Sequence, residues 1–278
     1  MILLVAFFLE KEVIVKKGTF LTLLLAFTLM VAGPASAHFG MLIPSDQMVM
    51  KGENTDIKLD LRFWHPSEDI GMELARPSRF AVVVNGKETG LLGSLKDTKT
   101  KGHQTWAADY KIERPGVHVF YMEPQPYWEP AEGIFIIHYT KTVMTALGTE
   151  EGWDQEIGLK TEIVPLSKPY GLSTCPDLKT FTDKNVFKGV VKLDGKPVPY
   201  AHVEVEYYNE DGKCSPASDH MATHTKADSK GVFAYAVPKA GWWGFAALST
   251  SDTKIKHDGE DKDVELGAVL WIRFHDMK

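Results

Sequence analysis

The sequence predicts an all-β protein built from two antiparallel β-sandwich domains. Apolar and polar residues alternate at residues 57–63, and Ile134, Ile136 and His138 continue the same period of two on one face of a later segment. This period is typical of a strand with one buried face. Turn pairs such as Asn85-Gly86 and Asp194-Gly195 separate segments of this kind, as the tight turns of antiparallel hairpins do. Helical patterns are scarce, and the best candidate is short, at residues 141–147.

The composition is that of an ordinary globular protein. Of the 278 residues, 44% are apolar and 24% are charged, so the chain has enough apolar material for a full core. The formal net charge is −6, so the chain lacks the basic excess that is typical of nucleic-acid binding. We therefore expect no nucleic-acid partner.

The N-terminal segment predicts export. Residues 11–17 supply a basic flank, residues 20–32 supply an apolar run, and Ala35-Ser36-Ala37 supplies the small residues that precede a cleavage point. We expect residues 1–37 to be a signal peptide that is removed after Ala37, which places the mature protein in the periplasm or outside the cell. The alternative is an uncleaved anchor, although the apolar run is short for a membrane span.

The chain has two cysteines, Cys175 and Cys214. Both stand in polar, turn-rich surroundings, and an exported protein meets a compartment that permits disulfides. We expect the two cysteines to form a disulfide that closes a loop. The alternatives are a redox pair and a Cys/His metal site, but the spacing matches neither a C-x-x-C motif nor a zinc finger.

Two prolines within residues 161–170 suggest a domain boundary. We expect an N-terminal β-sandwich at residues 38–165 and a C-terminal β-sandwich at residues 166–278. Strand patterns at residues 187–193 and 201–208 mark the second domain. Their order resembles the small Greek-key sandwiches of the carboxypeptidase-regulatory or transthyretin type, a fold that by itself implies no activity.

Cleavage after Ala37 would make His38 the first residue of the mature protein. Its free α-amine and its ring Nδ1 could then close a six-membered chelate on one metal ion, which no internal histidine can do. Nitrogen ligands in a planar or tetragonal arrangement suit Cu(II) or Ni(II). The alternative is that a histidine follows the cleavage point by chance.

Three further histidines could complete a metal site and would make the first domain the metal-binding one. His65 continues the apolar face of residues 57–63 at the end of that strand. His138 ends a second alternating segment, just after an aromatic and acidic loop at residues 126–132. His103 lies in a polar loop and could be a ligand or a solvated side chain. For His65 and His138, a structural role in the core is the alternative.

The sequence contains no familiar enzyme motif. The patterns G-x-S-x-G, H-E-x-x-H, the P-loop and G-x-G-x-x-G are all missing from it. The acidic runs at residues 149–151 and 258–265 are expected to be solvated loops rather than catalytic pairs. Trp242-Trp243 could line a sugar or partner site, with one ring buried and the other half-exposed. We predict that the protein is not an enzyme.

Five stretches carry a resemblance to one known family. They are HFGMLIPS at residues 38–45, RFWHP at residues 62–66, PYWEPAE at residues 126–132, TEIVPL at residues 161–166 and GWWGFAAL at residues 241–248. These stretches are similar to the NikM-like periplasmic component of nickel or cobalt uptake systems, and the likeness spans nearly all of the chain after residue 37.

The resemblance implies metal delivery. Members of that family support the import of Ni²⁺ or Co²⁺ through the membrane components of an energy-coupling-factor type transporter. The resemblance carries His38 and His65 over as the positions that match the family's early histidines. The cysteine-bearing segment at residues 174–180 is longer than the family's usual connection and is a departure from it.

The expected function is therefore that of a non-enzymatic, periplasmic metal-binding protein that supports nickel or cobalt uptake. One alternative is a copper protein with an N-terminal histidine brace, either a chaperone or an oxidase. Another is a structural or carbohydrate-binding double sandwich, which gives His38 no role. Affinity alone does not separate nickel from copper, because Cu²⁺ outcompetes Ni²⁺ at most nitrogen sites.

Processing of the exported chain is directly testable. Intact-mass and N-terminal analysis should show a mature protein that begins at His38, because Ala35-Ser36-Ala37 favours cleavage after Ala37. A chain that begins elsewhere would either lack His38 or hold its nitrogen in an amide bond. Either result would contradict the chelate.

Overall fold

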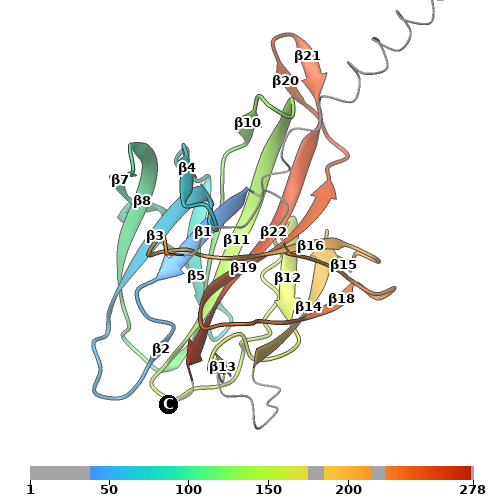
Figure 1. Ribbon diagram of the computed structural model, residues 1–278. Coiled ribbons are helices and arrows are strands. Elements are labelled where there is room, and N and C mark those ends of the chain that lie inside the picture. Colours follow the sequence, from blue (N-terminus) through green and yellow to red (C-terminus); the bar gives the residue numbers. More distant parts are fainter. Residues whose placement is uncertain (1–37, 175–184, 214–222, 277–278) are drawn as a thin grey trace, which may run out of the picture. The chain divides into compact units, whose positions relative to one another are not determined.

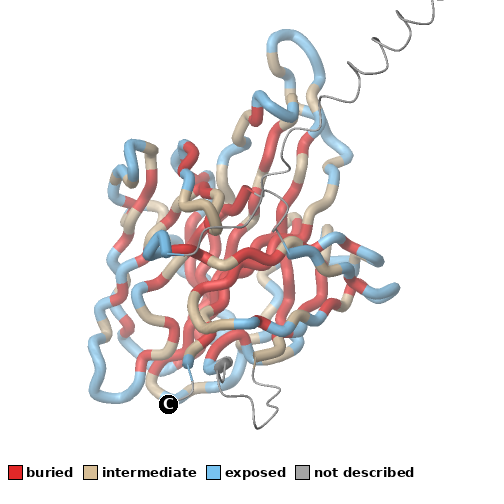
Figure 2. The backbone as a smooth tube through the Cα atoms, in the orientation of Figure 1, coloured by how far each residue is buried: buried red, intermediate tan, exposed pale blue. Residues whose placement is uncertain are grey.

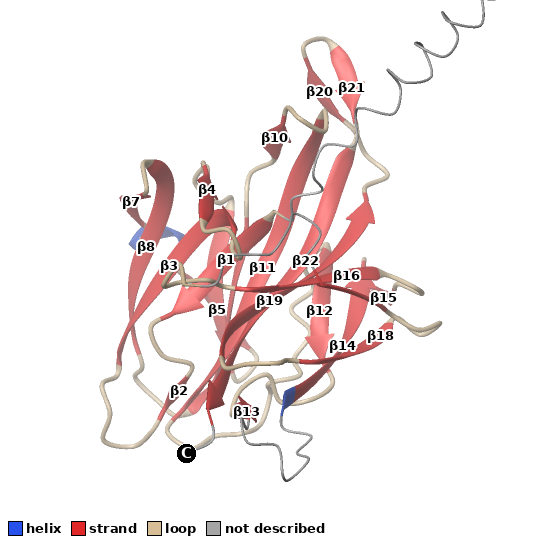
Figure 3. Ribbon diagram, viewed as in Figure 1, coloured by secondary structure: helices blue, strands red, loops and turns tan. Residues whose placement is uncertain are grey.

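The computed structural model describes residues 38–174, 185–213 and 223–276. Regular structure in these segments is almost entirely β-strand, as the red ribbons of Figure 3 show. A short 3-10 helix, η1 (Leu92–Ser94), interrupts the strands. The predicted all-β fold of antiparallel sandwiches is confirmed.

Two predictions fall outside the described residues. They are the signal peptide at residues 1–37 and the disulfide between Cys175 and Cys214. Within the part that is described, no helix has the length and apolar character needed to cross a membrane.

Five strands form the first sheet, and all neighbours in it are antiparallel. The order is β1-β3-β8-β7, and β4 pairs with the end of β3. The bounds are β1 (Phe39–Pro44), β3 (Asp56–His65), β4 (Ile70–Met72), β7 (Lys96–Thr100) and β8 (His103–Lys111). The alternation predicted at residues 57–63 is confirmed, because Ile57, Leu59, Leu61 and Phe63 all enter one core.

Eleven strands form the central sheet (Figure 1). Its order is β17-β16-β19-β22-β11-β9-β5-β6, while β2 and β10 also pair with β11 and β13 also pairs with β22. The bounds are β2 (Met48–Val49), β5 (Arg79–Val84), β6 (Lys87–Gly90), β9 (Gly116–Glu123), β10 (Tyr127–Glu129), β11 (Ile134–Ala146), β13 (Leu172–Thr174), β16 (His202–Tyr207), β17 (Thr223–Lys226), β19 (Gly241–Thr250) and β22 (Val264–Asp276). Asn85 and Gly86 join β5 to β6 with φ of 52° and 71°, the positive values that a two-residue hairpin turn requires.

Four strands form the third sheet, in the order β12-β14-β15 with β18 beside β14. Their bounds are β12 (Thr161–Pro165), β14 (Val186–Leu193), β15 (Lys196–Pro197) and β18 (Val232–Ala236). A separate hairpin pairs β20 (Ile255–His257) with β21 (Glu260–Lys262).

The three sheets are stacked as layers, with the central sheet in the middle. On β11, Ile136 packs into the core shared with the first sheet, while Val143, on the opposite face, packs with Ile163 of the third sheet. On β9, Phe120 and Val119 divide between the two cores in the same way. The two sandwiches therefore share one sheet, and strands from both sides of the boundary predicted after residue 165 lie in it.

Two long strands, β11 and β22, run side by side through the central sheet (Figure 1). They are parallel, and their pairing extends from Phe135 opposite Val264 to Thr142 opposite Trp271. Both strands are covered on both faces for most of their length, which Figure 2 shows as the red centre of the tube. Parallel strands that are buried on both faces have long apolar runs in their sequences, and residues 266–272 of β22 form such a run.

Two sequence-based expectations are wrong in this region. The segment at residues 141–147 is not a helix: its first six residues continue β11, which ends at Ala146 and pairs with β22 on one side and β9 on the other. Its β-branched residues favour the extended form. Trp242 and Trp243 are both buried, at 6% and 5% exposure, because each face of β19 meets a different core.

The strand β11 also carries one fully buried charge. The Nζ of Lys141 donates to Oε2 of Glu162 on β12 at 2.5 Å, and the two side chains are 1% and 2% exposed. Glu162 further accepts from the backbone N–H groups of Ile157 and Gly158. Burial lowers the pKa of Lys141, and the carboxylate of Glu162 opposes that shift. Each buried charge is thus compensated by its partner.

Removing one member of this pair should be costly. Lys141→Met should lower the free energy of unfolding by about 3–5 kcal/mol, because it leaves the Glu162 carboxylate buried without its cation. Urea unfolding followed by tryptophan fluorescence measures the change. The matched double variant Lys141→Met/Glu162→Gln removes the stranded charge and keeps an oxygen for the Gly158 N–H, so it should recover most of the loss. Equal stability of the single variant and the unsubstituted protein would contradict this account.

Candidate functional site

The candidate site begins where β1 and β3 end side by side. Their antiparallel register places Phe39 opposite Trp64, so one further step brings His38 opposite His65. The two rings are in contact, with centroids 4.6 Å apart in an edge-on arrangement. Phe63, on the same face of β3 as His65, lies in the core between the first and central sheets. The predicted pair of histidines is therefore brought together at the edge of that core.

Glu129 on β10 determines which nitrogen of the His38 ring carries the proton. Its Oε2 lies 2.9 Å from His38 Nε2. A carboxylate can only accept, so Nε2 carries the proton and Nδ1 keeps its lone pair. Nδ1 is the atom that could close a chelate with the α-amine of His38. A carboxylate hydrogen-bonded to the far nitrogen of a ligand histidine is common in metal sites, because it fixes both tautomer and orientation.

Burial keeps the His38 and His65 rings neutral. Burial lowers the pKa of His38, and nearby His138 lowers it further, while Glu129 raises it. The pKa of His65 falls to about 4, mainly through burial and then through His38. A neutral imidazole has a lone pair to offer a metal ion at neutral pH.

His138 lies on β11, where β1 crosses the central sheet. Its ring packs edge-on against Phe63 with centroids 5.7 Å apart, and its Nδ1 accepts from the backbone N–H of Gly40 at 3.4 Å. A Cβ at Gly40 would lie 3.1 Å from His138 Cβ, and a Cβ at Gly267 of β22 would lie 2.6 Å from His138 Nε2. The His138 side chain therefore packs against Gly40 and Gly267, where any larger residue would force its neighbours to move.

The nitrogen atoms of His138 are arranged differently from those of His38. Nδ1 accepts from Gly40, so the proton is on Nε2. Nε2 is buried and has no hydrogen-bond partner among the described residues. Its nearest carboxylate, Glu265 on β22, is 3.7 Å away, which is too long for a hydrogen bond. The structure places His138 beside the predicted ligands, but in this tautomer it has no free lone pair for a metal.

His103 is not brought to this group. It begins β8, where its ring packs against Trp64 at a centroid distance of 6.0 Å and its Nδ1 lies 3.5 Å from Glu73. Trp64 and His65 are adjacent on β3, so their side chains point to opposite faces of the sheet. His103 therefore lies on the far face of the first sheet from His65.

The described side chains alone do not form a complete metal cage. Within the described ranges, no three His, Cys, Asp or Glu side chains are arranged to hold a metal ion. The candidate donors are Nδ1 of His38 and the ring of His65, and the backbone nitrogen of His38 is an amide in the uncleaved chain. Cleavage after Ala37 would add the α-amine as a third donor.

Carboxylates gather near the histidines on the central sheet. Burial and the neighbouring carboxylates raise the pKa of Glu204 on β16 to about 8, and burial raises the pKa of Glu206 to about 7. Glu265 acts electrostatically on both Glu204 and His38. Mutually repelling carboxylates of this kind favour the binding of protons or metal cations.

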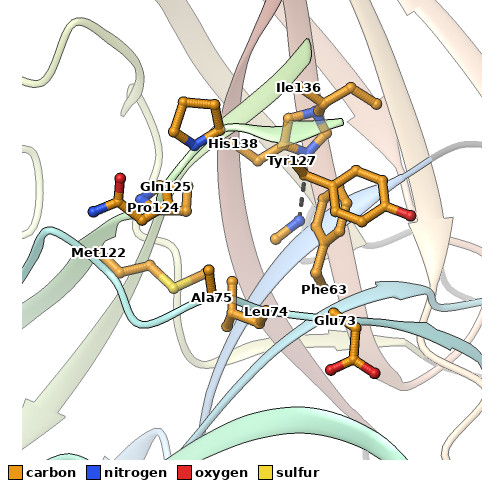
Figure 4. Close-up of a pocket in the computed structure, with 12 residues that line it drawn as sticks. Phe63, Glu73, Leu74, Ala75, Met122, Pro124, Gln125, Tyr127, Ile136 and His138 are labelled. Atoms are coloured by element: carbon orange, nitrogen blue, oxygen red, sulfur yellow. Dashed lines mark hydrogen bonds between the residues drawn. The ribbon is translucent and has the colours of Figure 1, made fainter. Parts of the chain in front are cut away.

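A pocket opens beside the histidines (Figure 4). Its cavity volume is about 40 Å³, and Phe63, Tyr127 and His138 are among its lining residues, whereas His38 and His65 are not. The ring centroids of Phe63 and Tyr127 lie 5.7 and 6.3 Å from that of His38. The pocket and the pair of histidines therefore share walls.

Sequence reasoning missed two carboxylates of this site. Glu129 lies in the aromatic and acidic loop that drew attention to His138, and the hairpin that pairs Glu129 with Ile134 puts it on the face of His138. Alternation within that loop was the signal that could have found it. Glu265 left no such signal, because the parallel pairing of β11 with β22 joins segments far apart in the chain.

A family model described as "Domain of unknown function (DUF4198)" matches residues 35–251. The chain belongs to the DUF4198 family. The matched range of this DUF4198 domain includes His38, His65, Glu129 and His138 but ends before Glu265. No curated protein matches the chain.

Solved structures show only a distant similarity to this DUF4198 protein. The D0-D1 domain of intimin has a TM-score of 0.24 at 9% identity, over 84% of this chain and 99% of that one. The adhesin InvE of Yersinia pseudotuberculosis has a TM-score of 0.23 at 9% identity, over 85% and 61%. The major pilin subunit BcpA of Bacillus cereus has a TM-score of 0.20 at 10% identity, over 87% and 69%. Scores this low indicate nothing about function.

The neutral state of His65 has a consequence for stability. Its pKa is about 4 in the folded protein against an ordinary value of 6.5, so the unfolded chain takes up the proton first. The free energy of unfolding should therefore fall as the pH drops from about 6.5 to about 4. Urea unfolding across this range should show a shallower fall for His65→Asn than for the unsubstituted protein. His103→Asn is the matched control and should keep the full fall; an unaltered fall in His65→Asn would contradict the buried neutral ring.

Proposed function

We propose that this protein is a periplasmic metal-binding protein that captures Ni²⁺ or Co²⁺ and presents it to the membrane components of an importer, without catalysing a reaction. The observation that carries the proposal is the contact between the His38 and His65 rings, with Glu129 on His38 Nε2, directly after the predicted cleavage point. The resemblance of the sequence to NikM-like proteins supports the same role.

The donor set suits a borderline transition metal. After cleavage, His38 would bind through its α-amine and Nδ1, and His65 would add a second imidazole. Three nitrogen donors are typical of sites for Ni²⁺, Co²⁺ and Cu²⁺, whereas Mg²⁺ and Ca²⁺ prefer oxygen. Glu129 would hold the His38 ring in the tautomer that this chelate needs.

Metal binding at this site competes with protons mainly at the α-amine of His38. An α-amine has an ordinary pKa of about 7.7–8.0 and must lose its proton to bind. Burial already keeps His65 neutral, with a pKa of about 4. Metal affinity should therefore weaken as the pH falls below about 8, chiefly through the amine.

The electrostatic surroundings favour a cation. Glu129 and Glu265 both raise the pKa of His38, which means that both stabilise positive charge at its position. A divalent ion bound there would gain from the same two carboxylates. This supports a metal cation, rather than an anionic ligand, as the cargo.

Copper binding is the second candidate, and the same two histidines favour it. An N-terminal histidine chelate with a second imidazole is a histidine brace, and Cu²⁺ binds most nitrogen sites more tightly than Ni²⁺. Consumption of oxygen by the copper-loaded protein in the presence of a reductant would indicate an oxidase. Metal analysis of the protein isolated from its native compartment separates nickel or cobalt from copper.

The test compares a chain that begins at His38 with one that carries an additional glycine before it. The extension keeps the imidazole and converts the amine to an amide. Calorimetric titration with Ni²⁺ at about pH 8 should show a loss of affinity of about 10- to 100-fold for Glu129→Gln, and at least as large a loss for the extended chain and for His65→Ala.

His103→Ala is the matched control, because this histidine lies on the far face of the first sheet, against Trp64. Its Ni²⁺ affinity should equal that of the unsubstituted chain. Unchanged affinity in the extended chain or in His65→Ala would overturn the proposed site.

A further inference from the structure

We infer that Glu206 and Asn209, at the end of β16, are positioning residues of the metal site. They hold the turn that follows His65 and thereby keep its ring against that of His38. The inference rests on the proposed function, because it concerns the affinity of the site that these two histidines form. It makes metal binding at the first sheet depend on a strand of the central sheet.

His65 receives little support from its own sheet. β8 pairs with β3 only as far as Leu61, and β1 pairs with it as far as Trp64. His65 ends the strand and pairs with Ile70 of β4, across the turn at residues 66–69. β4 has three residues, and a hairpin this short is marginally stable by itself. Contacts from outside the hairpin are therefore needed to fix the turn.

The end of β16 supplies three hydrogen bonds to the first half of this turn. Nδ2 of Asn209 donates to the Ser67 carbonyl at 3.1 Å, and the backbone N–H of Asn209 donates to the Pro66 carbonyl at 3.0 Å. Oε2 of Glu206 accepts from the backbone N–H of Ser67 at 3.3 Å. Both backbone polar groups of Ser67 are thus bonded to the central sheet.

These contacts are buried, whereas the second half of the turn is held separately. Glu206 and Asn209 are 5% and 4% exposed, so a lost bond leaves a polar group without ready access to water, which is costly. Asp69, at the far end of the turn, accepts from Nε1 of Trp64 at 2.9 Å. Loss of the contacts from β16 should therefore loosen the half of the turn next to His65 and leave the rest in place.

The metal site is sensitive to such loosening. One ion must meet Nδ1 of His38 and a ring nitrogen of His65 at the same time, and the two ring centroids are 4.6 Å apart. Binding constellations must be held within about 0.5 Å of the productive geometry. Loss of one hydrogen bond that orders the turn should lower the metal affinity about three- to tenfold, which corresponds to the usual net contribution of such a bond.

The first test is Asn209→Ala in the chain that begins at His38. Calorimetric titration with Ni²⁺ at about pH 8 should show an affinity about three- to tenfold lower than that of the unsubstituted chain. Asn185→Ala is the matched control, because Nδ2 of Asn185 likewise donates to a backbone carbonyl, that of Val237, at 3.1 Å beside the third sheet. The control should keep the full affinity.

A second pair of variants decides the inference if circular dichroism shows that Asn209→Ala does not fold. Glu206→Gln and Glu206→Leu both remove the negative charge, but only glutamine keeps an oxygen that can accept from the Ser67 N–H. Glu206→Leu should therefore bind Ni²⁺ at least threefold more weakly than Glu206→Gln. Equal affinities in this pair would contradict a positioning role for Glu206.

A double-variant comparison separates positioning from a general loss of structure. In a His65→Ala chain, Asn209→Ala should have no further effect on the Ni²⁺ affinity, because the turn acts through His65. A general loss of structure would lower the affinity by the same factor whether His65 is present or not.

The outcomes distinguish this inference from the proposed function. If Ni²⁺ does not bind the chain that begins at His38, the proposed function fails and the inference fails with it. If Ni²⁺ binds but Asn209→Ala keeps the full affinity, only the inference is overturned. It is also overturned if Asn209→Ala lowers the affinity equally in the presence and absence of His65.

Discussion

The parallel pairing of β11 with β22 is the constraint on which the rest of this structure depends. It joins a strand from the middle of the chain to the last described strand, and both are covered on their two faces. Neither sandwich could bury its apolar surface with its own residues alone, because each uses the shared sheet as its second layer. The ion pair of Lys141 and Glu162 stands where the third sheet covers β11, so the position of β12 is specified by charge as well as by apolar packing.

The same pairing positions the candidate site. Gly267 on β22 leaves the space in which the His138 ring lies, and Gly40 on β1 approaches closely enough to donate to that ring. The close approach of β1 brings His38 to the edge of the core, opposite His65. A site built on strand ends of two packed sheets is held by their register rather than by a loop, which limits the movement of its side chains.

Burial has opposite effects on the two kinds of titratable group at this end of the sandwich. It keeps the His38 and His65 rings neutral and raises the pKa of Glu204 and Glu206. Neutral imidazoles bind metals, and crowded carboxylates are relieved by cations. Both effects have one physical cause, because burial favours the uncharged form of each group.

The sequence by itself determined the local features of this protein. Alternation marked the strand that ends at His65, the pair Asn85-Gly86 marked a hairpin turn, and the small residues before His38 singled out that histidine. These features are local because the period of side chains along a strand and the φ values of a turn depend on neighbouring residues only. The meeting of His38 with His65 could be hypothesised, since both were candidate metal ligands, but the register that brings them together could not be predicted.

Only the tertiary structure decided which strands meet. It placed Glu129 and Glu265 beside the histidines, turned His103 to the far face of the first sheet, extended β11 through the segment expected to be helical, and buried both Trp242 and Trp243. Many strands here share the same alternating pattern, so the pattern tells which face of a strand is buried but not which strand or sheet covers it. Packing between segments far apart in the chain decides which strands pair, and the local sequence of one segment does not identify its partner.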